Sequence, residues 1–198
     1  LDELRITGGE PMMSPNLWRL LDWIETQGEK MNPQMRIAIN SNLGAKQSII
    51  DRFKTKLKGF KNFHLYTSME ATHKQGEYIR DGLDYGEWFS NFLHMMVDKV
   101  PSEIHNMCTI NALCLESLPE LLEKIVWFKS ASKVYGPKVN FTLNILRFPS
   151  FQSPLVLPND LRNKFKGDLV KFLNSNEKHL EHMEVNQTQR LIDYLDVV

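Results

Sequence analysis

The sequence predicts an α/β protein whose parallel strands alternate with outer helices and curl into a complete or partial barrel. Strand-like and helix-like patterns alternate along all 198 residues. Repeated strand–helix units need right-handed crossovers, which build a parallel sheet. Within the strands, apolar and polar residues alternate, whereas a parallel strand buried on both faces is a nearly continuous apolar run. We therefore expect one face of the sheet to pack on helices and the other to line a concave interior that is filled by water or by a ligand.

Periodicity places the individual elements. Strands are expected at residues 3–7, 36–41, 62–69, 103–112 and 138–146. Helices are expected from residue 14, at 46–57 and 85–100, from 117, after the loop 148–158, and at about 185–195. Ser14 and Pro15 supply an N-cap and a proline at the first helical position. Ser117 and Glu120 have the spacing of a capping box.

Strand parity assigns polar side chains to the interior face. Ser68 and Glu70 alternate with Leu65 in the third strand. In the same way, Asn111 and Asn144 belong to the polar faces of the fourth and fifth strands. Each could bond a ligand, although Glu70 could equally cap a turn and each Asn could be satisfied structurally.

Composition excludes several classes of function. Lys plus Arg and Asp plus Glu number 24 each, so the formal net charge is zero. That balance gives no electrostatic footprint for nucleic acid or a membrane surface. No apolar run approaches the roughly 20 residues of a membrane helix. Two cysteines are too few for a disulfide framework, which favours a reducing cytoplasm.

The turn after the first predicted strand is Gly8-Gly9-Glu10-Pro11. Two glycines let a ligand approach the backbone closely. Glu10 adds a carboxylate, and Pro11 stiffens the exit. A ligand ammonium group needs such acceptors. Because ligands of these folds bind at the carboxyl ends of the strands, the turn is predicted to bind an amino group.

Other polar residues have a structural alternative. Arg80 is a fork-shaped donor for a ligand carboxylate, or else it pairs at the surface with Glu77 or Asp84. Asn42 either binds a ligand or shapes a turn.

Two further groups are expected to be structural. Trp18 and Trp23 have helical spacing and are predicted to be core residues. A cluster near the C-terminal end is predicted to form a solvated helix face rather than a metal site: His179, Glu181, His182 and Glu184.

Residues 4–11, Leu-Arg-Ile-Thr-Gly-Gly-Glu-Pro, resemble the second strand and turn of the radical S-adenosylmethionine (radical SAM) enzymes. Residues 39–43, Ile-Asn-Ser-Asn-Leu, resemble the family's third strand with its Asn-rich turn. Residues 65–71, Leu-Tyr-Thr-Ser-Met-Glu-Ala, resemble its fourth strand. The turn is the specific part of the resemblance, and the later segments support it by their order.

The resemblance continues to the end of the chain. Residues 77–82, followed by Trp88 and Asn91, are similar to the subgroup called twitch-domain radical SAM proteins. Residues 109–111 and the proline-bearing segment after Leu146 match later strands. Nearly the whole chain is covered.

The family resemblance implies a cofactor and its contacts. In the family, the Gly-Gly-Glu-Pro turn contacts the amino group of S-adenosylmethionine, and a Ser and an acidic residue lie near its ribose and carboxylate. The implied cofactor-binding residues are Gly8, Gly9, Glu10, Pro11, Asn42, Ser68, Glu70, Arg80, Asn111 and Asn144. In the complete family fold, a 4Fe-4S cluster reduces the cofactor to a 5′-deoxyadenosyl radical, which abstracts hydrogen from substrate.

The sequence departs from the family at the iron site. The family's cluster is held by three cysteines spaced C-x3-C-x2-C, and that motif does not occur here. Cys108 is expected to be a small buried hydrophobe, and Cys114 is a weak candidate for a cluster ligand or a reactive thiol. We expect the first β/α unit and the cluster ligands to precede Leu1, so no metal ligand is assigned within this chain.

The resulting hypothesis is a truncated radical SAM core at residues 1–150 with a C-terminal helical extension at 151–198. It would bind S-adenosylmethionine in the cytoplasm, receive electrons from a donor, and act on an unknown substrate, with a peptide or protein left open. No nucleic acid or membrane partner is expected. Two alternatives remain: a cluster-less scaffold that binds a partner, and a barrel enzyme without redox chemistry. The loop 147–151 lacks the glycine typical of a phosphate turn, which argues against the second.

Overall fold

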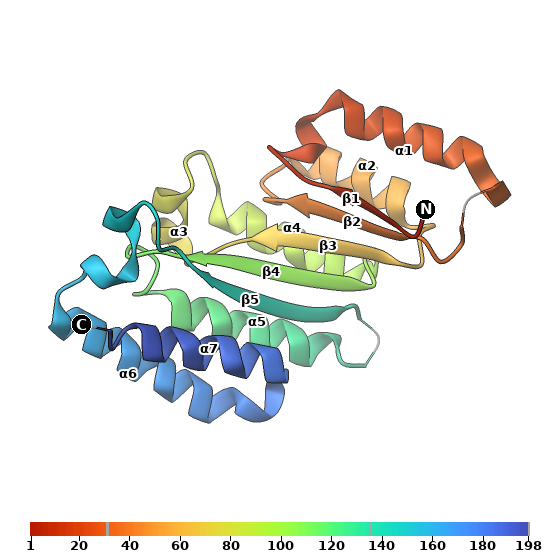
Figure 1. The fold of residues 1–198 in the computed structure, drawn as a ribbon. Coiled ribbons are helices and arrows are strands. Elements are labelled where there is room, and N and C mark those ends of the chain that lie inside the picture. Colours follow the sequence, from red (N-terminus) through yellow and green to blue (C-terminus); the bar gives the residue numbers. More distant parts are fainter. Residues whose placement is uncertain (31, 135, 198) are drawn as a thin grey trace. The chain divides into compact units, whose positions relative to one another are not determined.

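The computed structural model describes residues 1–30, 32–134 and 136–197, and it has the predicted α/β architecture (Figure 1). Within these residues, a five-stranded sheet has the order β1-β2-β3-β4-β5. The strands are β1 (Glu3–Ile6), β2 (Arg36–Ser41), β3 (Phe63–Ser68), β4 (Glu103–Ile110) and β5 (Lys138–Ile145). The helices are α1 (Pro15–Gln27), α2 (Gln47–Leu57), α3 (His73–Ile79), α4 (Tyr85–Val97), α5 (Leu118–Ser132), α6 (Asn159–Asn176) and α7 (His182–Tyr194). The sequential strand order and the intervening helices confirm the predicted parallel arrangement.

The chain forms two compact units. The first unit comprises Leu1–Ser68, Gly86–His105 and Ser132–Val139. The second unit comprises Met69–Tyr85, Asn106–Ala131 and Asn140–Val198. In the first unit, β1 pairs in parallel with β2 and β2 pairs in parallel with β3, with Ile6 opposite Ile39 and Ile39 opposite Leu65.

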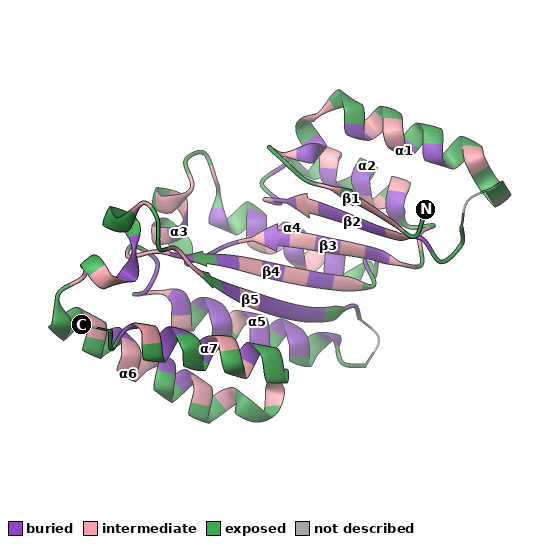
Figure 2. Ribbon diagram, viewed as in Figure 1, coloured by how far each residue is buried: buried purple, intermediate pink, exposed green. Residues whose placement is uncertain are grey.

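Burial confirms the predicted strand parity in β3, whereas in β5 Asn140 of the predicted polar face is buried (Figure 2). In β3, Phe63 and Leu65 are fully buried, whereas His64, Tyr66 and Ser68 are only half-buried. In the first unit, helices pack against the buried face of β3. The ring of Phe53 in α2 meets that of Phe63 edge-on at 5.8 Å, and the Trp88 indole of α4 donates to Thr67 Oγ1 at 3.0 Å.

The start of α1 was predicted correctly. The Ser14 hydroxyl accepts a hydrogen bond from the Asn16 N–H, as an N-cap side chain does. Leu17, Leu21 and Ile24 form the buried stripe of this helix. The prediction for Trp23 was wrong, because its side chain lies on the opposite side of α1 and is 58% exposed.

Other elements differ from the sequence prediction. Helix α3 was not predicted, because it spans only two turns and lacks an apolar stripe. Ser117 and Glu120, which have the spacing of a capping box, both bind Thr72 at the start of α3. Ser117 Oγ accepts from the Thr72 N–H, and the Glu120 carboxylate accepts from Thr72 Oγ1. These bonds hold the start of α3 against α5.

Helix α7 covers the outer edge of β5 in the second unit. The Glu184 carboxylate accepts from the Phe141 N–H at 3.0 Å, and Gln187 Oε1 accepts from the Leu143 N–H at 2.7 Å. Arg190 donates to the Leu143 carbonyl at 3.1 Å. These side chains satisfy the backbone groups that an edge strand leaves unpaired. The prediction that Glu184 is solvated was therefore wrong: it is fully buried and paired with Lys129.

No helix within the described residues is both long and apolar enough to cross a membrane.

Candidate cofactor-binding site

The Gly8-Gly9 turn follows β1 and is exposed. Both residues have positive φ angles, 93° and 53°, in the region that glycine adopts without steric cost. A Cβ atom at either position would meet no other heavy atom within 4 Å. The backbone of this turn is thus open to a ligand, and glycine is required here by conformation rather than by packing.

Glu10 joins the turn to the end of β2. One carboxylate oxygen accepts from the Met12 N–H at 3.1 Å and from Ser41 Oγ at 2.8 Å. The other accepts from the Asn42 N–H at 2.7 Å. A carboxylate has about four lone-pair positions, so three bonds leave one for a further donor. Ligand binding by Glu10 is therefore compatible with its structural role. Pro11 follows as the first residue of a short 3-10 helix, Pro11–Met13, and is buried.

Asn42 shapes the turn after β2. Its Oδ1 atom accepts from the Gly44 N–H at 2.8 Å, an Asx turn. Leu43 has a positive φ of 53° and is fully buried. The Asn91 amide of α4 stabilises this turn, because it donates to the carbonyls of Leu43 and Ala45 at 2.8 and 3.0 Å. Asn42 therefore shapes its turn, which is the structural alternative for this residue. Its Nδ2 group takes no part in the hydrogen bond with Gly44.

In the second unit, Glu70 and Arg80 form a two-point ion pair. Arg80 Nε donates to one carboxylate oxygen at 2.7 Å, and Nη2 donates to the other at 2.5 Å. Glu70 also accepts from the Thr109 N–H at 3.3 Å. The Glu70 side chain is 3% exposed and that of Arg80 is 26% exposed. Arg80 is thus paired with Glu70, and its guanidinium has further N–H groups that can donate to a ligand.

The other predicted residues follow strand ends or occupy them. Ser68 is the last residue of β3 and is half-buried. Asn111 follows β4, and its amide shapes a turn by accepting from the Leu113 N–H and donating to the Thr109 carbonyl. Asn144 lies near the end of β5 and is exposed.

Sequence reasoning missed several residues that position these groups. Ser41 supports Glu10, as described above. The Asn106 side chain is fully buried and donates to the Met69 carbonyl at 3.0 Å, which fixes the segment leading to Glu70. The available signal was an Asn at an apolar position of β4, where a buried amide needs a specific partner.

The two cysteines do not fit an iron–sulfur cluster. Cluster ligands are thiolates, which form readily at exposed, electropositive sites. Burial raises the pKa of the Cys108 thiol well above its ordinary value. Burial also raises the pKa of Cys114 to about 12, and its Sγ atom donates to the Asn111 carbonyl. Cys108 is the buried residue that the sequence predicted, and Cys114 is fully buried as well.

The residues around the Gly8-Gly9 turn do fit an amino-acid ligand. They combine an open backbone with a carboxylate that has one free acceptor position. A cavity of about 230 Å³ lies beside the turn, between Gly8 and residues of α1 such as Leu17 and Leu20, and Glu10 does not line it. That cavity is smaller than the usual 300–1,000 Å³ of small-molecule sites, so it can hold only part of a ligand.

No protein-family model matches the sequence, and no curated protein matches it. Solved structures do match. One is a domain of pyruvate-formate lyase-activating enzyme from Bacteroides vulgatus, with a TM-score of 0.54 and 11% identity over 85% of this chain and 93% of that one. Another is Streptococcus suis SuiB bound to the precursor peptide SuiA, with a TM-score of 0.56 and 15% identity.

A third match is anSMEcpe with bound AdoMet and the Cp18Cys peptide, with a TM-score of 0.52 and 13% identity. The present chain is covered to 88% in the last two matches, and it spans 36% of SuiB and 47% of anSMEcpe. These proteins are radical SAM enzymes. The chain therefore has the α/β fold of the partial barrel found in radical SAM enzymes.

Proposed function

We propose that this chain is the S-adenosylmethionine-binding core of a radical SAM enzyme. The observation that carries the proposal is the Gly8-Gly9-Glu10-Pro11 turn, with its open backbone and available carboxylate, at the carboxyl end of β1 in a sheet of this fold. Neighbours with this fold are described as bound to S-adenosylmethionine. A core at residues 1–150 and a helical extension at 151–198 remain our domain division.

Each proposed contact has a chemical role. Gly8 and Gly9 present backbone acceptors, and Glu10 a carboxylate, to the ammonium group of the cofactor. The cofactor carboxylate would take N–H groups of Arg80 that Glu70 leaves free. Since Glu70 and Arg80 are bonded to each other, we expect them to act as a unit. The proposed nucleoside contacts are Ser68, Asn111 and Asn144, and Asn42 borders the amino-acid end.

The bound cofactor, reduced by a 4Fe-4S cluster, would supply a 5′-deoxyadenosyl radical that takes hydrogen from a substrate. This chain's residues contribute binding, orientation and exclusion of water. Neither cysteine of the chain suits the cluster, so its ligands are expected from residues outside this sequence. An electron donor and a cytoplasmic location are part of the same proposal.

For the substrate we propose a peptide or protein. The support is that SuiB is described as bound to the precursor peptide SuiA and anSMEcpe as bound to a peptide with AdoMet.

The test uses the full-length protein, reconstituted anaerobically with iron, sulfide and a reductant. We expect formation of 5′-deoxyadenosine from S-adenosylmethionine. Gly9→Val should weaken cofactor binding at least about tenfold, because a β-branched residue is strained at φ 53° and would shift the backbone of the turn. Gly59→Val is the matched control, since Gly59 is also exposed and has open space around it.

Two outcomes would contradict the proposal. The absence of 5′-deoxyadenosine despite a loaded cluster would favour a cluster-less binding scaffold. If the Gly9 and Gly59 variants bound the cofactor equally well, the Gly8-Gly9 turn would not be part of the binding site.

A further inference from the structure

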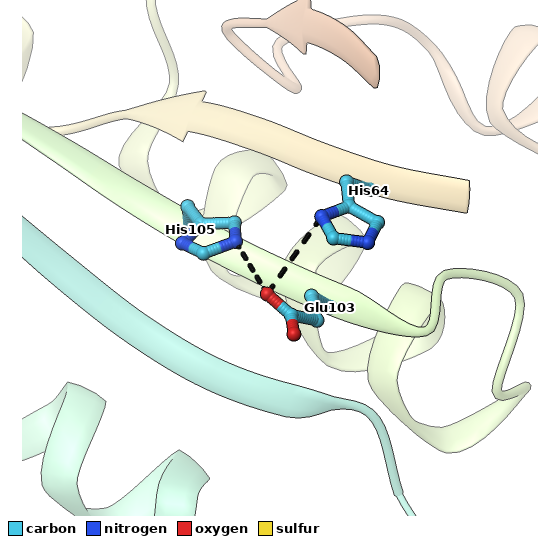
Figure 3. A group of neighbouring side chains, drawn as sticks. All are labelled: His64, Glu103 and His105. Atoms are coloured by element: carbon cyan, nitrogen blue, oxygen red, sulfur yellow. Dashed lines mark hydrogen bonds and ion pairs between the residues drawn. The ribbon is translucent and has the colours of Figure 1, made fainter. Parts of the chain in front are cut away.

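Three side chains of the first unit converge on the polar face of the sheet (Figure 3). His64 belongs to the start of β3, and Glu103 and His105 belong to the start of β4. The Glu103 carboxylate oxygen lies 2.8 Å from His105 Nε2 and 3.7 Å from His64 Nδ1. All three potential ligand atoms lie within 4.8 Å of one another. Because these residues begin their strands, the cluster lies at the opposite end of the strands from the Gly8-Gly9 turn.

His64 presents a buried nitrogen without a hydrogen-bond partner to this cluster. Its Nε2 atom bonds Asn62 Oδ1 at 3.0 Å, so the proton resides on Nε2 and Nδ1 carries the lone pair. Within the described residues, Nδ1 is buried and makes no hydrogen bond. An unpartnered lone pair beside a carboxylate is costly unless a cation or donor satisfies it. The Asn62 bond is the outer contact that typically orients a metal-binding histidine.

The Glu103 carboxylate is the negative charge of the cluster, and it attracts a cation. The side chains of both histidines are largely buried, and the neutral imidazole is the form that ligates metals. Arg36 also faces the cluster, but its guanidinium is paired with Glu3. The more distant Lys138 adds one positive charge near His105. Tyr66 stacks on His105 with ring centroids 4.6 Å apart and fixes the imidazole plane.

We propose that His64, Glu103 and His105 form a binding site for a first-row divalent metal ion, with Zn²⁺ the best fit. Two imidazoles and one carboxylate are a known tetrahedral zinc set that leaves one position open. Ligand atoms of such a site are about 3.3 Å apart, given bonds of roughly 2.0–2.1 Å. The separations of 2.8 and 3.7 Å from the Glu103 oxygen bracket that value, and the two imidazole nitrogens lie within 4.8 Å of each other, so rotation of the side chains would complete the set. Metal binding through His105 Nε2 would require the tautomer of this ring that carries its proton on Nδ1, with the Nε2 proton passing to solvent and Nδ1 taking one up.

The site is accessible to an ion. The side chains of His64, His105 and Glu103 are 12%, 15% and 30% exposed, so the carboxylate forms the open side. The nitrogen ligands select transition ions over Mg²⁺ and Ca²⁺, which prefer all-oxygen sites.

The test is titration of the metal-free full chain with Co²⁺ and then Zn²⁺, followed by visible absorption. We expect one Co²⁺ per chain, with d–d bands of a nitrogen- and oxygen-bound ion, no thiolate charge-transfer band, and displacement by Zn²⁺. Mg²⁺ should not compete. Glu103→Gln and His105→Gln should each weaken Zn²⁺ binding at least about a hundredfold, and Asn62→Ala about tenfold as an outer contact.

His182→Gln is the matched control, because His182 is an exposed histidine of α7. Circular dichroism without metal verifies that each variant is folded, and the near-isosteric Glu103→Gln keeps the test valid if a histidine variant unfolds. A thiolate band, binding unaffected by Glu103→Gln, or equal loss in His182→Gln would overturn the proposal. Every readout is a metal titration, so a negative result would contradict the metal site without bearing on cofactor binding.

Discussion

At the residue scale, the buried carboxylate of Glu70 depends on Arg80. Replacing Glu70 by Gln keeps the side-chain size but removes the charge that the guanidinium binds at two points. We expect the free energy of unfolding to fall by about 2 kcal/mol, less than for a fully buried pair because Arg80 remains partly hydrated. Urea unfolding provides the measurement. Glu123→Gln, at an exposed position of α5, should change stability by less than about 0.5 kcal/mol.

The two thiols give a second prediction at this scale. Because burial raises the pKa of Cys114 from 9.0 to about 12, the folded chain retains its thiol proton where the unfolded chain loses it. The resulting contribution to stability is complete below pH 9 and declines as the pH rises toward 12. At pH 8, neither Cys108 nor Cys114 should react with a thiol reagent until urea unfolds the protein. Rapid labelling of the native chain would contradict this expectation.

At the element scale, helix α7 substitutes for a neighbouring strand along β5. Gln187→Ala should lower the free energy of unfolding by about 1 kcal/mol, because the Leu143 N–H loses its acceptor. Glu184→Ala should cost about 3 kcal/mol or more, since it also leaves the buried Lys129 ammonium without this carboxylate. Thermal or urea unfolding measures both.

Gln189→Ala is the control within the same helix. Gln189 is exposed and bonds Asp193, so its loss should be nearly neutral. If Gln187→Ala were equally neutral, water would satisfy the β5 edge as well as the helix does. Light scattering adds a readout, because an uncovered edge strand pairs with other chains.

At the scale of the whole molecule, the prediction concerns the affinity of this chain alone. Without iron to chelate the amino and carboxylate groups, polar contacts must hold the zwitterion in water. Exposed ion pairs contribute at most about 1 kcal/mol each and are screened by salt. S-adenosylmethionine should therefore bind with a dissociation constant on the order of millimolar or weaker. Isothermal titration tests this, and micromolar binding would favour a function without the cluster.

The sequence alone determined the alternation of strands and helices, the parity of β3 and the Gly8-Gly9 turn. These are local: periodicity reports which face is buried, and a positive φ demands glycine wherever it occurs. The sequence did not determine which polar residues have a structural role. Asn42 and Asn111 shape their own turns, and Arg80 binds Glu70.

Tertiary structure decided the contacts between residues far apart in the chain. Glu184 occupies a helix that looks solvated by composition, yet it is buried because the β5 edge and Lys129 need its oxygens. His64 meets Glu103 and His105 only because β3 and β4 are neighbours in the sheet. A hydrogen bond or a metal site depends on the distance between atoms. For residues far apart in the chain, strand order and register fix that distance. Residue patterns along one segment do not encode strand order or register.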